Sequence, residues 1–351
     1  MRYRLFGKSG LRVSELCLGT MTFGEEWGWG ANIDDSCAMF DTFLNAGGNF
    51  IDTANRYTEG TSEKYVGEFI KANSVRDKVV LATKYTLFMQ TGDPNSAGNQ
   101  RKNMVQAVEH SLRRLQTDYI DLLWVHAWDY MTPPEEIMRG LDDLVRAGKI
   151  LYVGISDSPA WRVAQCNTMA ELRGWSRFVG LQVEYSLIER TVERELLPMA
   201  RAFDMAVTPW GIIGGGVLTG KYSKKDKQES STQRYEEGSD SIRLGDKALA
   251  IGDEVVAIAI EIGCSPANVA INWTRQQPGN IIPIVGVRTK TQLDDNLKAL
   301  DNPLSDKHLT RLDDISAIEL GFPHDFLGKD YIRKLVYADT FDQIDPHREL
   351  L

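Results

Sequence analysis

Four residues of this chain have side chains that together suit the transfer of a proton to an oxygen atom. Asp52, Lys84 and His126 each lie at the end of a short apolar run, and Tyr57 lies in the segment after the first of these runs. A tyrosine hydroxyl titrates near pH ~10, but a neighbouring ammonium group lowers that pKa. A carboxylate can keep the ammonium group charged, and a histidine can orient a carbonyl oxygen or relay a proton. The combination predicts a proton donor for a developing alkoxide.

Each of the four residues also has an ordinary structural explanation when it is taken alone. Asp52 could cap the following helix, and Lys84 could point toward water. A histidine such as His126 after an apolar run is more often a core residue than a catalyst, and Tyr57 alone indicates nothing. The functional interpretation depends on coincidence, because three successive apolar runs end in the residue types that this chemistry needs.

The segments that must position these residues alternate between short apolar runs and amphipathic helical patterns. Short runs rich in Val, Ile and Leu are typical of strands buried on both faces of a parallel sheet. We predict strands at 16–20, 50–53, 79–83, 122–126, 151–155, 181–183, 206–208 and 281–284. Helices are predicted from Asp34, from Pro133-Pro134, and at 63–71, 103–115, 160–172, 194–202, 247–262 and 291–300.

This alternation predicts an α/β fold, a (β/α)8 TIM barrel formed by one domain over residues 1–351. The alternative is a doubly wound open sheet, which usually carries a glycine-rich dinucleotide turn after its first strand. No GxGxxG motif occurs in the chain. Residues 3–6 and 11–13 flank Lys8-Ser9-Gly10 and predict a β-hairpin at the bottom of the barrel. Active sites of such barrels lie at the carboxyl ends of the strands, where the four residues stand.

Composition excludes several classes of protein. The chain has 351 residues, is 42% hydrophobic and 25% charged, and carries a net charge of −9, so it lacks the basic surface that nucleic acids and anionic membranes attract. We see no apolar run long enough for a membrane span and no signal peptide. The 4 cysteines form no CxxC pair, which favours thiols in a reducing cytoplasm over disulfides or a metal site.

Several motifs of the chain resemble those of the aldo-keto reductases. They span almost the whole chain in the order and spacing of the family: CLGTMTFG (17–24), GGNFIDTANRY (47–57), VLATK (80–84), DYIDLLWVHAWD (118–129), LVRAGKILYVGIS (144–156), LQVEYSLIER (181–190), TPWGIIGGGVLTGKY (208–222) and PIVGVRTKTQLDDN (283–296). The chain is most similar to the bacterial group that also resembles potassium-channel β-subunits. The resemblance implies a catalytic tetrad of Asp52, Tyr57, Lys84 and His126, with Tyr57 as the general acid.

The resemblance also implies an extended nicotinamide dinucleotide bound without a Rossmann fold. Gly19, Thr20 and Met21 would lie near the nicotinamide ribose, Ser156 and Gln182 would bind the carboxamide, and Trp210 would stack on the ring. The pyrophosphate and the adenosine would follow the glycine-rich loop and the segment after the eighth strand. The remaining implied cofactor residues are Asp52, Asp157, Gly211, Ile212, Ile213, Gly214, Gly216, Leu218, Gly220, Lys221, Arg234, Gly286, Arg288, Gln292 and Asn296.

Three features depart from the pattern of the family. The usual Ser-Asn after the fifth strand is Ser156-Asp157 here, so an acceptor-only carboxylate replaces an amide. The usual Ser-Pro-Leu after the stacking aromatic residue is Gly211-Ile212-Ile213, which loses a hydroxyl group. Residues 223–245 form a long polar loop, so the position of Arg234 near the pyrophosphate is the least specified.

Some of these cofactor residues also have simpler explanations. Trp210 could be ordinary packing at the rim of the barrel, and Gly214–Gly216 could be a plain flexible loop. Gln292 and Asn296, spaced i and i+4, could lie on a solvated helix face.

The leading functional prediction is an NADPH-dependent reductase of aldehydes or ketones, with NADH as a possible cofactor. Arg288 presents a planar fork of donors that suits a 2′-phosphate, and Lys290 adds charge. Asp294 and Asp295 oppose this preference, although helical spacing directs Asp294 away from the face of Gln292. The loops 25–31, 87–101 and 127–131 carry aromatic and apolar side chains, so an apolar or aromatic carbonyl substrate is expected.

Two other functions remain open at this point. The chain could be a nucleotide-sensing subunit that binds the cofactor and turns over slowly, although its tetrad is intact. It could also be a barrel lyase or isomerase that uses Lys84 to form a Schiff base. In the second case, Trp210 and the segment 288–296 would have no role.

Overall fold

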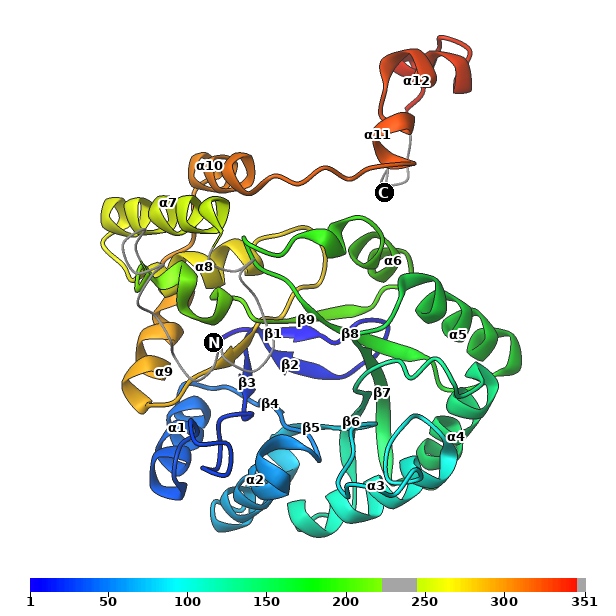
Figure 1. Ribbon diagram of the computed structural model, residues 1–351, viewed down its shortest axis with the longest axis vertical. Coiled ribbons are helices and arrows are strands. Elements are labelled where there is room, and N and C mark those ends of the chain that lie inside the picture. The colour runs from blue at the N-terminus through cyan, green and yellow to red at the C-terminus, as the bar shows by residue number, and fades with distance from the viewer. Residues whose placement is uncertain (223–244, 346–351) are drawn as a thin grey trace.

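The computed structural model describes residues 1–222 and 245–345, and it confirms the predicted (β/α)8 barrel (Figure 1). The barrel strands are β3 (Cys17–Gly19), β4 (Phe50–Asp52), β5 (Val80–Tyr85), β6 (Ile120–Val125), β7 (Ile150–Ser156), β8 (Phe178–Glu184), β9 (Ala206–Trp210) and β10 (Ile284–Gly286). All neighbouring strands pair in parallel, and β10 pairs with β3. Strands β9 and β10 stand at the two ends of this strand order. The segment before β10 connects to β9 through the Ile282 N–H, which donates to the Val207 carbonyl at 2.8 Å.

The last strand begins later in the chain than the sequence predicts. Residues 281–284 were expected to form it, but β10 covers Ile284–Gly286. Pro283 has no N–H to donate to a ladder, so regular pairing starts after it. The Pro283 carbonyl still accepts from the Cys17 N–H at 2.9 Å, and Ile281 makes a single bridge to Val207.

Helices surround the strand ring in Figure 1 and follow the predicted pattern closely. They are α1 (Ile33–Asn45), α2 (Thr61–Ala72), α3 (Arg101–Leu115), α4 (Pro134–Arg146), α5 (Ala160–Arg173), α6 (Leu196–Ala202), α7 (Asp246–Ile262), α8 (Pro266–Arg275) and α9 (Lys290–Leu297). Asn32, rather than Asp34, caps α1 by accepting from the Asp35 N–H at 2.9 Å. Helix α8 was not predicted, although Ser265-Pro266 is a typical helix start.

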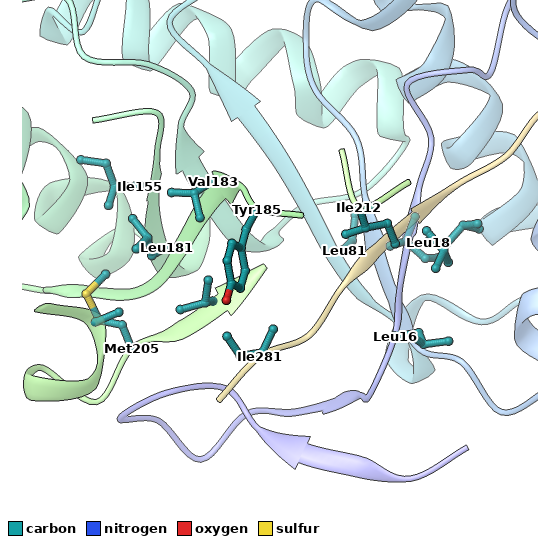
Figure 2. Packing of buried hydrophobic residues seen from close by; sticks show 14 of the residues in the cluster. Leu16, Leu18, Leu81, Ile155, Leu181, Val183, Tyr185, Met205, Ile212 and Ile281 are labelled. Carbon is teal, nitrogen blue, oxygen red and sulfur yellow. The ribbon is translucent and has the colours of Figure 1, made fainter. Parts of the chain in front are cut away.

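Alternation along the strands separates two apolar clusters. Residues of one parity fill the inside of the barrel, where Cys17, Phe50, Val80, Ala82, Leu122, Trp124 and Ile284 belong to one cluster. Residues of the other parity pack outward against the helices in a larger cluster. Figure 2 shows part of that larger cluster, with Leu16 and Leu18 on one segment and Leu181 and Val183 on β8. The parity of a residue therefore decides whether its side chain enters the barrel.

A hairpin of β1 (Tyr3–Leu5) and β2 (Arg12–Ser14) lies across the middle of the strand ring in Figure 1. Its turn carries Phe6, whose ring lies 5.4 Å from the Phe50 ring and 6.2 Å from the Trp124 ring. Phe50 stands at the start of β4, so Phe6 fills the end of the barrel opposite to the carboxyl ends of the strands. The predicted hairpin at the barrel bottom is confirmed.

The chain continues after the barrel into α10 (Asp306–Ser316), α11 (His324–Leu327) and α12 (Asp330–Val336). Helix α10 packs on α7 through Arg311, which pairs with Glu254 at 2.7 Å. Helices α11 and α12 stand apart from the strand ring in Figure 1. Within the described ranges, residues 1–222 and 245–345, no helix is both long enough and apolar enough to cross a membrane.

Candidate active site

The carboxyl ends of β4, β5 and β6 bring the four proton-transfer residues together. The Lys84 ammonium group donates to the Asp52 carboxylate, to the Thr53 carbonyl at 2.9 Å and to the Tyr57 hydroxyl at 3.0 Å. The Tyr57 ring stands nearly perpendicular to the His126 imidazole, with 5.9 Å between ring centroids. One lysine therefore contacts both the carboxylate and the phenol.

Strand alternation explains why these particular side chains meet. Asp52 has the same parity as Phe50, and Lys84 has the same parity as Val80 and Ala82, all of which point into the barrel. His126 has the parity of Trp124. The intervening Thr83 points outward instead, where its hydroxyl donates to Glu63 on α2 at 2.5 Å.

Burial and the neighbouring charges set the protonation of the lysine and the phenol. Burial by itself lowers the pKa of Lys84, but Asp52 and Tyr57 outweigh that effect and raise its pKa to about 12. Burial raises the pKa of Tyr57, and the Lys84 charge acts in the opposite direction without overcoming it. Lys84 acts on the phenol in the direction predicted from the sequence, but burial outweighs it, so the pKa of Tyr57 lies above its ordinary value instead of below it.

His126 is neutral in this environment. Its burial, followed by the charge of Lys84, holds the pKa of His126 well below its usual range. Its Nδ1 atom is buried and has no hydrogen-bond partner among residues 1–222 and 245–345. Because His126 also lines the cavity described next, an oxygen-bearing ligand there could receive a hydrogen bond from the imidazole.

A cavity of about 720 Å³ opens at this end of the barrel. It extends from the tetrad to the start of α9, and most of the predicted cofactor residues lie on its wall. Those residues are Gly19, Met21, Asp52, Ser156, Asp157, Gln182, Trp210, Gly211, Ile212, Ile213, Gly216, Lys221, Gly286, Arg288, Gln292 and Asn296, with Tyr57 and His126 beside them.

Four predicted cofactor residues do not line this cavity: Thr20, Gly214, Leu218 and Gly220. Thr20 lies two residues after Leu18, so its side chain points out of the barrel as that of Leu18 does, and its hydroxyl donates to the Asp52 carbonyl at 3.0 Å. Leu218 is buried in the outer cluster. Arg234 lies outside the described residues, as does most of the predicted loop 223–245.

The half of the cavity away from the tetrad is built to receive anionic groups. Three successive glycines, Gly214–Gly216, have left-handed φ values of 57°, 65° and 103°, so this short 3-10 segment (η4, Gly214–Thr219) has a backbone that side chains rarely permit. Lys221 and Arg288 supply positive charge at the wall, and the residues around the start of α8 add the positive end of a helix dipole. The Lys221 and Arg288 side chains and the N-terminus of α8 suit the phosphates of a dinucleotide.

Asp157 and Trp210 form a hydrogen-bonded pair on the same wall. The Trp210 indole N–H donates to the Asp157 carboxylate at 3.3 Å. Burial raises the pKa of Asp157, while the bond from Trp210 lowers it by less. Gln182 donates its amide N–H to Asp52 at 3.1 Å, so this side chain also helps to hold the carboxylate that pairs with Lys84.

Several cavity residues were not predicted from the sequence. Arg56 lines the wall next to Tyr57, and Thr22 lines it where its hydroxyl donates to the Val287 carbonyl at 2.5 Å. Ser265, Pro266 and Ala267 line it at the start of α8. The position of Arg56 directly before Tyr57 was the available signal. In the described part of the chain, no three His, Cys, Asp or Glu side chains gather as a metal site.

Comparison with known proteins agrees with this geometry. The Aldo/keto reductase family model matches residues 15–317. The norsolorinic acid reductase of Emericella nidulans is 39% identical over 327 residues, which cover 91% of this chain and 82% of the relative.

Two further relatives carry aryl-alcohol dehydrogenase names. The aryl-alcohol dehydrogenase [NADP(+)] of Phanerodontia chrysosporium is 38% identical over 337 residues, covering 91% of this chain and 86% of the relative. An aryl-alcohol dehydrogenase of Pestalotiopsis microspora is 36% identical over 335 residues, covering 93% and 85%. The chain belongs to the aldo/keto reductase family and is an NAD(P)H-dependent oxidoreductase.

Proposed function

We propose that this chain is an NADPH-dependent reductase of aromatic aldehydes or ketones in which Tyr57 is the proton donor. The observation that carries the proposal is the contact of 3.0 Å between the Lys84 ammonium group and the Tyr57 hydroxyl, at the floor of a cavity that also exposes a neutral imidazole. A neutral phenol held by a fixed cation is an acid that can release its proton as negative charge develops on a nearby oxygen.

The residues of the chain divide the work of carbonyl reduction. When bound, the reduced nicotinamide supplies a hydride to the carbonyl carbon. The carbonyl oxygen then accepts hydrogen bonds from Tyr57 and His126, and the Tyr57 proton passes to it as it becomes an alcohol oxygen. Lys84 stabilises the phenolate that remains, and Asp52 keeps Lys84 charged and in place.

The charges around the start of α9 support NADPH over NADH. Arg288 lines the cavity and presents its guanidinium fork to a 2′-phosphate. Lys290 does not add to this charge, because it pairs with Asp294 at 2.6 Å. Asp295 also lines the cavity and favours a free 2′-hydroxyl, so NADH stays the alternative cofactor.

The substrate end of the cavity supports an aromatic carbonyl compound. Trp27 and Leu87 line the wall, and the Trp27 ring lies 6.4 Å from the Tyr57 ring and 5.6 Å from the Trp29 ring. Flat aromatic surfaces favour flat aromatic ligands. The relatives support the same substrate class, since two of them are named aryl-alcohol dehydrogenases.

The proposed acid is tested by Tyr57→Phe, which removes one oxygen atom and keeps the ring. The variant should bind NADPH as the wild type does and reduce benzaldehyde about 10²–10⁴-fold more slowly. Binding is measured by quenching of tryptophan fluorescence and turnover by NADPH absorbance. A Phe variant with the wild-type rate would show that Tyr57 is not the proton donor.

A nucleotide-sensing subunit is the second candidate, and steady-state turnover of benzaldehyde separates it from a reductase. Schiff-base chemistry at Lys84 is disfavoured, because an amine whose pKa is about 12 is protonated at pH 7 and is a poor nucleophile.

Three features stay predictions: the bacterial channel-like subgroup, the cytoplasmic location and the single domain over residues 1–351. The relatives reported above are fungal.

A further inference from the structure

The turn directly after Tyr57 has an unusual backbone. Thr58 and Glu59 have φ values of 44° and 54°, and Gly60 follows at 91°. Left-handed conformations are uncommon for residues other than glycine and are least expected for a β-branched residue such as Thr58. Such conformations persist only where the surrounding contacts enforce them, and they concentrate at functional sites.

The Thr58 side chain provides the first of these contacts. Thr58 is buried, its hydroxyl donates to the Phe23 carbonyl at 2.6 Å, and it accepts from the Ser62 N–H at 3.1 Å. The Ser62 hydroxyl lies 2.9 Å from the Thr53 hydroxyl, and the Thr53 carbonyl accepts from Lys84 at 2.9 Å. The turn and the lysine that contacts Tyr57 are therefore fixed to the same short segment after β4.

The Glu59 side chain provides the second contact. Its carboxylate accepts from the Trp27 indole N–H at 3.2 Å and forms an ion pair with Arg56. Trp27 and Arg56 both line the cavity next to Tyr57. The left-handed turn thus places one carboxylate where it holds two residues of the substrate wall.

We infer that Thr58 and Glu59 are positioning residues with separate roles, in which Thr58 fixes the Tyr57 hydroxyl against Lys84 and Glu59 fixes the Trp27 wall that receives an aromatic substrate. The inference rests on the proposed function, since it takes Tyr57 as the acid. It predicts that changes at two adjacent residues affect two different kinetic constants.

The role of Thr58 is tested by comparing Thr58→Val with Thr58→Ser. Valine keeps the shape and loses both hydrogen bonds, so kcat for benzaldehyde should fall about ten- to hundredfold while KM changes less than about twofold. Serine keeps the hydroxyl and should restore most of the rate. Unchanged NADPH affinity and circular dichroism confirm that each variant is folded.

The pH profile separates positioning of the acid from general loosening. The charges that act on Tyr57 are those of Lys84, Asp52 and Asp157. If Thr58→Val moves the phenol away from Lys84, the pKa of Tyr57 rises and the basic limb of the kcat profile moves to higher pH. A lower kcat with an unmoved basic limb would overturn the role given to Thr58.

The role of Glu59 is tested by Glu59→Asn, since asparagine tolerates a left-handed φ but is too short to reach Trp27. The KM for benzaldehyde should rise about two- to tenfold, as expected for one ordered aromatic contact, with kcat nearly unchanged. The KM for butanal should change little. Glu68→Asn, on the exposed side of α2, is the matched control for loss of one charge.

Tyr57→Phe is measured in parallel, so that failure of the positioning roles can be told apart from failure of the proposed acid. If Tyr57→Phe is inactive while Thr58→Val and Glu59→Asn match the wild type, the positioning inference fails and the proposed function stands. If Tyr57→Phe keeps full activity, the proposed acid fails and the inference fails with it.

Discussion

The chain carries a lysine–aspartate ion pair near each end of its cavity, and the two pairs differ in almost everything except composition. Lys84 and Asp52 meet on the floor of the cavity, at the carboxyl ends of β4 and β5, with side chains that are 0% and 3% exposed. Lys290 and Asp294 meet on the outer turns of α9 with side chains that are 56% and 44% exposed. The first pair joins two strands, whereas the second joins residues four apart on one helix.

The difference shows which ion pair the fold depends on. A buried charge without its partner is strongly unfavourable, so Lys84 and Asp52 are tied to each other and to the sheet around them. An exposed pair exchanges its contacts with water and contributes little. The floor is therefore fixed before any ligand arrives, while a rim charge that lines the cavity, such as Arg288, acts mainly on the ligand.

The largest effect is expected when the floor pair is broken. Lys84→Met leaves the Asp52 carboxylate buried without its cation, so the free energy of unfolding should fall by about 3–5 kcal/mol. Turnover at pH 7 should also fall much more than cofactor affinity, because the phenol loses its cation. Urea denaturation and steady-state kinetics measure the two losses, and a variant with full stability would show that the buried pair is dispensable.

A smaller effect is expected at the rim, and it should depend on the ligand. Arg288→Ala removes a guanidinium from the cavity wall, so NADPH should bind about ten- to hundredfold more weakly, the range for one charge-assisted hydrogen bond. NADH affinity should change far less. Fluorescence titration with both cofactors gives the ratio, and equal weakening for both would contradict a contact with the 2′-phosphate.

The floor pair should also appear in the alkaline stability of the chain. The pKa of Lys84 is raised from 10.5 to about 12 on folding, so the folded chain holds this proton more tightly than the unfolded chain. The resulting contribution of about 2 kcal/mol is complete below pH 10.5 and is lost as the pH rises through 12. Denaturation at pH 9 and 11.5 should show a smaller stability gap between wild type and Lys84→Met at the higher pH, and a gap that does not change with pH would contradict the raised pKa.

The smallest effect is expected for the rim pair. Lys290→Ala should change the free energy of unfolding by less than about 0.5 kcal/mol, because the pair is exposed to solvent and screened by salt. NADPH affinity should change little, because Lys290 forms its ion pair with Asp294. A loss as large as that of Arg288→Ala would mean that Lys290 contacts the cofactor directly.

The floor of the site was predictable because strand alternation is a local rule. Asp52, Lys84 and His126 share parity with apolar residues that must fill a barrel, so their side chains had to enter it. The same rule, applied strictly, would have excluded Thr20 from the wall. The helix geometry at α9 was equally regular, and Asp294 indeed turns away from the cavity to Lys290.

Contacts between distant segments were not predictable in this way. The left-handed turn at Thr58 depends on the Phe23 carbonyl from another loop, and helical or strand periodicity says nothing about it. The contribution of α8 to the wall depends on packing across the barrel end. Burial of Tyr57 outweighs the effect of Lys84 on its pKa, and only the folded environment sets that balance.

The hairpin that carries Phe6 also constrains the order in which the chain matures on the ribosome. Phe6 leaves the exit tunnel early, yet it belongs to a cluster with Ile282 and Ile284, which are synthesised near the end of the barrel. Strand β10 pairs with β3 across the same distance in the chain. Phe6 must therefore wait for the last strand before it is sealed from water, and we expect nascent chains that stop short of β10 to expose it to chaperones and proteases.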